Sequence, residues 1–175
     1  EFYRKQQGAY PVIYITFKDV KFDNWKDSLE AIRLVIRDEY MRHADILSWD
    51  GLDVVEKDYL DRMQKGTLSN VEYTRALLNL SRMLEKYHNK KIVVLIDEYD
   101  TPIQQGHSKG FYNEVITFMR NFMSGGLKDN LALAFGVLTG ILRVSKENLF
   151  SGLNNLVVNS VLDEKYSEYF GFTSD

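Results

Sequence analysis

Two adjacent carboxylates follow a short apolar run near the middle of the sequence. Residues 92–96 are all apolar and mostly β-branched, and Asp97 and Glu98 come directly after them. This pattern predicts a strand buried on both faces of a parallel sheet, with the acids at its carboxyl end, where open α/β sheets bind ligands. A carboxylate there suits a hard cation such as Mg²⁺, so Asp97 is the predicted metal- and cofactor-binding residue. A second carboxylate one residue later can orient and deprotonate water, which makes Glu98 the predicted base.

The segment KIVVLIDEYD, residues 91–100, is therefore a Walker B pattern, the acidic motif that serves Mg²⁺ and nucleotide in P-loop proteins. The simpler alternative is a strand end that exposes its acids to solvent. The matching phosphate-binding loop, G-x-x-x-x-G-K-[ST], is absent, because none of the 11 glycines is followed by lysine. In such folds the loop follows the first strand, upstream of a strand expected at residues 10–17, so truncation explains its absence better than degeneration.

The elements that must position these acids alternate between strand and helix. We expect strands at residues 10–17, 92–96, 131–138 and 156–161, and helices at 24–47, 52–64, 71–87 and 112–123. The third strand in this series is expected to be buried and to end at Thr139 and Gly140. Ser69 and Glu72 have the spacing of a capping box, Gly125 and its neighbour should stop the last long helix, and a residue at 145 should cap a short one. This alternation predicts an α/β fold with a three-layer parallel sheet flanked by helices.

Composition narrows the function classes. The 175 residues suit one domain, and with 45% hydrophobic and 27% charged residues the chain is ordinary and globular, without a stretch able to cross a bilayer. A net charge of −3 gives no basic field for nucleic-acid binding. The lack of cysteine excludes disulfides and thiolate metal sites and fits a cytoplasmic location. The chain starts without Met and ends abruptly, which we interpret as a fragment.

Four segments resemble consecutive blocks of the bacterial AAA-ATPase-like family: YPVIYITFKDV, VVLIDEYDTPI, GVLTGILRVSKENLFSGLNNL and SVLDEKYSEYFGFT. The resemblance implies a P-loop NTPase fold with sheet order 5-1-4-3-2. Residues 1–175 would then be a partial domain with strands 2 to 5, truncated at both ends and missing the first strand and the P-loop. It implies ATP and Mg²⁺ as cofactors of the full-length parent. In that family a Walker A loop precedes these blocks, and a lid region and a PD-(D/E)XK nuclease-like domain often follow.

The resemblance also assigns residues. The two acids match the Walker B acids, and Asp100 and Pro102 match a DEYDxP signature that shapes the turn after the strand. Thr139 lies where such ATPases place a polar residue that senses the γ-phosphate, although it could equally cap a strand end. Arg143 could stabilise charge on the transferring phosphoryl group, in cis or from a neighbouring subunit of a homo-oligomer, or be an ordinary surface arginine. No chemical role beyond a turn follows for the FSGLNNL block.

The predicted function is thus a fragment of an ATP-binding, ATP-hydrolysing domain, inactive alone and active as an ATPase in its parent. One alternative is a non-catalytic P-loop-like scaffold that binds partners. Another is an Mg²⁺-dependent nuclease, for which Asp163, Glu164 and Lys165 supply an acid-acid-lysine triplet beyond the last expected strand. The ATPase hypothesis makes a geometric prediction: Asp97, Glu98 and Thr139 should converge within one cleft at the carboxyl edge of the sheet, because their strands are neighbours.

Overall fold

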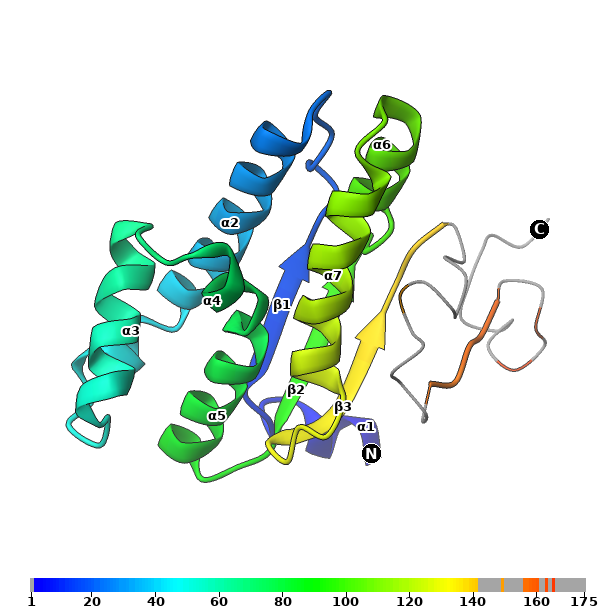
Figure 1. Ribbon diagram of the computed structural model, residues 1–175. Helices are drawn as coiled ribbons and strands as arrows, with labels where there is room; N and C mark the ends of the chain where they lie inside the picture. Colours follow the sequence, from blue (N-terminus) through cyan, green and yellow to red (C-terminus); the bar gives the residue numbers. More distant parts are fainter. Residues whose placement is uncertain (1, 142–148, 150–155, 161–162, 164, 166–175) are drawn as a thin grey trace.

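Three parallel strands and the helices that connect them form the body of the protein (Figure 1). The computed structural model describes residues 2–141, 149, 156–160, 163 and 165. The elements, in chain order, are α1 (Phe2–Gln6), β1 (Val12–Thr16), α2 (Trp25–Arg42), the 3₁₀ helix η1 (Ala44–Ser48), α3 (Val54–Lys65), α4 (Asn70–Thr74), α5 (Ala76–His88), β2 (Ile92–Asp97), α6 (Thr101–Lys109), α7 (Tyr112–Leu127) and β3 (Leu133–Leu138). None of these helices is both long enough and apolar enough to cross a membrane.

The described sheet has the order β1-β2-β3, with every pair parallel. The connections between consecutive strands run through helices. Of these helices, α2, α5 and α7 lie on the same side of the sheet (Figure 1). This arrangement follows from the right-handed crossover rule, because both connections move across the sheet in one direction. The expected α/β class and parallel sheet are confirmed.

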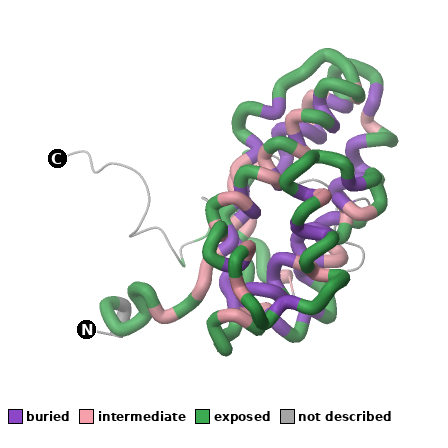
Figure 2. Tube along the Cα trace, turned by 90° about the vertical axis from the view of Figure 1, so that its left-hand side faces the viewer, coloured by how far each residue is buried: buried purple, intermediate pink, exposed green. Residues whose placement is uncertain are grey.

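The core lies between the sheet and these helices. Side chains alternate along a strand, so Ile13 and Ile15 of β1 point to the helix-covered face, where both are buried. Phe17 continues this row and meets Phe122 of α7 edge-on, with 6.4 Å between ring centroids. Figure 2 shows buried residues following the inward sides of the helices, whereas α1 is exposed. The helix-facing side therefore anchors the strands firmly.

The other face of the sheet is exposed in the described part of the chain. Tyr14, Leu95 and Val137 lie side by side in register on it. Tyr14 is 47% exposed, Val137 45% and Phe135 52%. The expectation of a buried strand at residues 131–138 is therefore wrong. β3 is the last strand of the described sheet, and the described helices leave the face to which its large side chains point in contact with solvent.

Several helix boundaries also differ from expectation. The helix expected to stop before Gly125 continues to Leu127, because Gly126 allows α7 to approach α5 closely: a Cβ at that position would lie 2.3 Å from Leu77 Cγ. The expected helix at 71–87 is two helices that meet at Arg75, and the one at 24–47 ends at Arg42. Helix α6 was not expected at all.

Helix starts were predicted better. The capping box of Ser69 and Glu72 is present, with the serine hydroxyl accepting from the Glu72 N–H and the glutamate accepting from the Ser69 N–H.

At the far end of the chain, residues 156–160 form no strand, so the expected strand at 156–161 is not found in its described part. Arg143, Ser145 and Glu164 lie outside the described residues.

Candidate functional site

The three strands end together at one edge of the sheet. Thr16 is in register with Asp97 across β1 and β2. The backbone ladder continues past both strands, with Phe17 N–H donating to Asp97 O at 3.0 Å and Thr139 N–H donating to Ile96 O at 2.9 Å. The residues at this edge are thus held by regular backbone hydrogen bonds and not by a loose loop.

The Asp97 carboxylate lies between two hydroxyl groups. Thr16 Oγ1 donates to Oδ2 at 3.0 Å, and Thr139 Oγ1 donates to Oδ1 at 2.5 Å. Each flanking strand therefore supplies one donor to a half-buried carboxylate, and the two bonds fix its orientation. The role of Thr16 was not expected, because a single threonine at a strand end has no distinctive pattern. Only the register across two strands brings it to Asp97.

Glu98 adopts an unusual backbone conformation. Its φ of +50° lies in the left-handed region, which is strained for a residue other than glycine and is often found at functional sites. The turn directs its carboxylate to the start of α6, where Oε2 accepts a hydrogen bond from Thr101 Oγ1 at 3.0 Å. Its N–H approaches Thr139 Oγ1 at 3.4 Å. Asp97, Glu98 and Thr139 thus lie together at the carboxyl edge, as expected, whereas the cleft expected around them stays a prediction.

Behind these residues, the turn after β2 holds the segment after β3. Asp100 is fully buried, and its Oδ2 accepts from Gln104 Nε2 at 2.7 Å and from the Ile141 N–H at 3.1 Å. Tyr99 N–H donates to Thr139 O at 3.1 Å. A Cβ at Gly140 would lie 2.6 Å from Asp100 Oδ1, so this close approach needs glycine.

The oxygen ligands of this edge fit one kind of metal binding. Among the described residues, no group of three or more His, Cys, Asp or Glu side chains could hold a metal ion. A cage made only of protein is therefore not supported there. Mg²⁺ bound with a nucleotide needs only one or two carboxylates, because phosphates and water supply its other ligands. Asp97 meets that requirement.

The described residues of the nuclease triplet show a different arrangement. Asp163 lies in a bend, not in a strand, and its Oδ2 accepts from the Ser160 N–H. A PD-(D/E)XK site needs its acids on adjacent strands. The described residues thus give the nuclease alternative no support.

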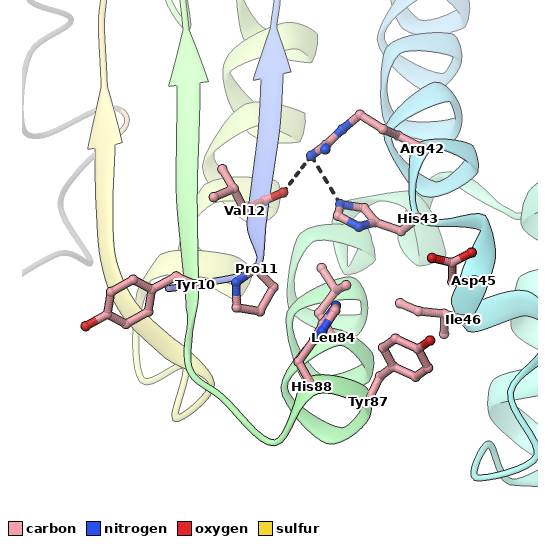
Figure 3. A pocket seen from close by; sticks show the side chains of 10 residues that line it. All are labelled: Tyr10, Pro11, Val12, Arg42, His43, Asp45, Ile46, Leu84, Tyr87 and His88. Atoms are coloured by element: carbon pink, nitrogen blue, oxygen red, sulfur yellow. Dashed lines mark hydrogen bonds between the residues drawn. The ribbon is translucent and has the colours of Figure 1, made fainter. Parts of the chain in front are cut away.

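A separate cleft lies at the amino edge of the sheet, beside Val12 at the start of β1 and thus at the opposite end of that strand from Thr16 (Figure 3). Its volume is about 350 Å³, and its walls come from the start of β1 and the residues before it, the ends of α2 and α5, and η1. Here Arg42 Nη2 donates to Val12 O at 2.5 Å. The buried Glu39 accepts from the Tyr14 N–H at 2.8 Å and from Arg42. These bonds occupy two polar groups on the outer edge of β1.

Glu39 is ionised in this arrangement. Burial alone would raise its pKa, but hydrogen bonds from His43, Arg42 and the Tyr14 N–H outweigh that effect and hold the pKa below its usual value. The negative charge keeps Arg42 in place, and the ion pair covers the β1 edge. This cluster thus binds polar backbone groups at the outer edge of β1. The sequence analysis predicted no role for its residues.

Comparison with known proteins gives a family match. The profile of a family described as predicted AAA-ATPase matches residues 1–150. An uncharacterized protein in the vnfD 5′ region of Azotobacter chroococcum mcd 1 is 37% identical over 95 residues, which make up 54% of this chain and 18% of that protein. The chain thus matches less than a fifth of the length of that relative. No solved structure matches the chain significantly.

Proposed function

Because the chain belongs to the predicted AAA-ATPase family, we propose that it forms part of a domain that binds ATP with Mg²⁺ and hydrolyses ATP in the full-length parent. One observation carries the proposal. The Asp97 carboxylate and the Thr139 hydroxyl are 2.5 Å apart at the carboxyl edge of the sheet, with Glu98 beside them. Such an edge is where parallel α/β sheets bind nucleotides.

Each residue has a proposed role. Asp97 would hold Mg²⁺, which would supply positive charge opposite the phosphates of the nucleotide. Glu98 orients the attacking water and accepts its proton. Thr139 contacts the γ-phosphate, and Arg143 stabilises charge on the transferring phosphoryl group. Thr16 keeps the Asp97 carboxylate in its orientation.

We further propose that a P-loop lies in a segment of the parent that adds a strand beside β3. The outer edge of β1 is already covered by Glu39 and Arg42, whereas β3 is the other edge strand. A right-handed connection from a strand beside β3 back to β1 must cross the open face. Its helix would then cover Tyr14 and Val137, whose exposure is unusual for a parallel sheet.

In this proposal the phosphate-binding loop lies outside residues 1–175, in which no glycine is followed by lysine. The loop that follows such a strand would present its backbone amides at the same edge as Asp97. The chain of residues 1–175 alone should therefore bind ATP weakly, because the loop provides most phosphate contacts. A cytoplasmic location, a homo-oligomer and a C-terminal nuclease-like domain in the same polypeptide are further expectations from the family.

The test uses the full-length parent and three variants. Glu98→Gln should leave nucleotide affinity unchanged and lower turnover about a hundredfold or more, as expected when a general base is removed. Asp97→Ala should weaken Mg²⁺-dependent nucleotide binding. Glu85→Gln is a matched control, because Glu85 forms a surface ion pair with Lys91, at the opposite end of β2. It should behave as wild type.

Nucleotide affinity by calorimetry and phosphate release by a coupled assay are the two measurements. Equal turnover in wild type and Glu98→Gln would remove Glu98 from the mechanism. Absence of turnover in the wild-type parent would leave the non-catalytic scaffold as the better description.

A further inference from the structure

We propose that Asp100 is a positioning residue that holds Thr139 against Asp97. This inference rests on the proposed function, because it concerns the placement of the residue that contacts the γ-phosphate. Asp100 itself is fully buried, so it acts through the chain segment that it binds.

The hydrogen bonds of Asp100 favour this role over helix capping. Asp100 precedes α6 at the N-cap position, where an aspartate commonly accepts from the first backbone amides of the helix. Its side chain forms no such capping bond. It accepts instead from the Ile141 N–H, 41 residues away in the chain, and from Gln104 on the next turn of α6.

Three contacts together fix the segment on both sides of Gly140. The Thr139 carbonyl accepts from the Tyr99 N–H, and the Ile141 N–H donates to Asp100. Between them, Gly140 packs so closely on Asp100 that a Cβ would lie 2.6 Å from Oδ1. The backbone that follows Thr139 therefore cannot shift without breaking a bond to the turn after β2.

The placement of Thr139 depends on this attachment. Thr139 lies just beyond β3, where its N–H donates to Ile96 O and its O accepts from the Tyr99 N–H, and Asp100 holds the segment that follows. The Thr139 hydroxyl lies 2.5 Å from Asp97 Oδ1, a distance that a small backbone movement would break. A carboxylate is costly to bury, and a residue that merely filled space there would be apolar. The buried carboxyl group is retained here because it provides the acceptor.

The test compares Asp100→Ala with Asp100→Asn in the full-length parent. The alanine variant loses the acceptor for the Ile141 N–H, whereas the asparagine oxygen can still accept both bonds. We expect Asp100→Ala to lower turnover about tenfold or more, a loss in the range expected when a buried backbone N–H loses its acceptor. Nucleotide affinity should fall by no more than about three- to tenfold, the change expected when Asp97 loses one hydroxyl donor, and Asp100→Asn should restore most of the turnover.

A second readout is independent of activity. In the same proteins, amide hydrogen exchange at Tyr99 and Ile141 should become about tenfold faster in Asp100→Ala, since local opening then breaks fewer bonds. Exchange at Val94, in the centre of β2, should be unchanged. If Asp100→Ala does not fold, Gly140→Ala replaces it, because its added methyl group must push the same segment away from Asp100.

Every outcome of these experiments supports or overturns the positioning role of Asp100. Wild-type exchange and turnover in Asp100→Ala, or equal losses in the alanine and asparagine variants, would overturn the positioning role. Exchange that rises throughout β2 would show a general loss of stability and would also overturn it. If the wild-type parent has no turnover, the proposed function fails, while the exchange data still decide whether Asp100 holds the segment.

Discussion

The left-handed conformation of Glu98 predicts an inverted preference between glycine and alanine. With φ at +50°, any residue with a Cβ is strained, at a cost of about 1–2 kcal/mol. Glycine avoids this strain but loses more conformational entropy on folding, about 0.5–1 kcal/mol relative to alanine. Glu98→Gly and Glu98→Ala both lose the hydrogen bond from Thr101, so that loss cancels in the comparison. We therefore expect the glycine variant to be more stable, by about 1 kcal/mol.

A control at Lys57 should give the opposite sign. This residue is exposed in the interior of α3, where alanine is favoured over glycine by about 1 kcal/mol. The assay is urea unfolding of the parent, with midpoints compared at equal slope. If Glu98→Ala equals or exceeds Glu98→Gly in stability, while Lys57 shows the ordinary order, Glu98 does not occupy a left-handed conformation and its strain plays no part in the site.

Three further outcomes are expected. Thr16→Val removes one hydroxyl donor to the carboxylate at the end of β2 and should weaken Mg²⁺-dependent nucleotide binding about three- to tenfold. Calorimetry measures this affinity, and Thr16→Ser should stay close to wild type. Equal affinities of the valine and serine variants would contradict this expectation. Hydrogen bonds, of which the one from Arg62 has the largest effect, lower the pKa of Glu72 to about 2. The ionised Glu72 side chain therefore contributes to stability above about pH 4.5, and this contribution is lost as the pH falls towards 2. Thermal melting between pH 2 and 6 should therefore show a weaker pH dependence for Glu72→Gln than for wild type, and parallel curves would refute it. Gly126→Ala should lower the free energy of unfolding by about 1–3 kcal/mol through overpacking. Gly125→Ala should be neutral or stabilising, because its Cβ would meet nothing closer than 3.6 Å. Urea midpoints that rank the two variants in reverse would be inconsistent with the α5–α7 packing.

Local patterns predicted the elements that depend on local chemistry. The run of β-branched residues before Asp97 formed a strand, and the capping box at Ser69 began a helix, because both signals act over a few residues. The adjacency of the strands that end at Asp97 and Thr139 followed from the family resemblance, not from periodicity. The metal ligand, the base and the sensor remain predicted roles, although their predicted convergence is present.

Long-range packing produced the differences. Gly126 does not stop α7, because its neighbour in space is Leu77, which no sequence window reveals. The apolar character of residues 131–138 does not bury β3, since burial depends on what covers the sheet and not on the strand itself. The left-handed φ of Glu98 is likewise set by the turn between two packed elements. The sequence predicted which residues carry the proposed chemistry but not which neighbours orient them.

The hydrogen bond between Thr16 and Asp97 joins residues 81 positions apart. Everything from α2 to α5 must fold between them, and closing so long a loop is entropically costly, so contacts of this kind form late. A chain that is still folding, or that has lost the β1–β2 pairing, lacks the oriented carboxylate even if its helices are intact. The carboxyl edge that carries the proposed metal site is thus a late product of folding, and under that proposal partly folded chains would not bind nucleotide there.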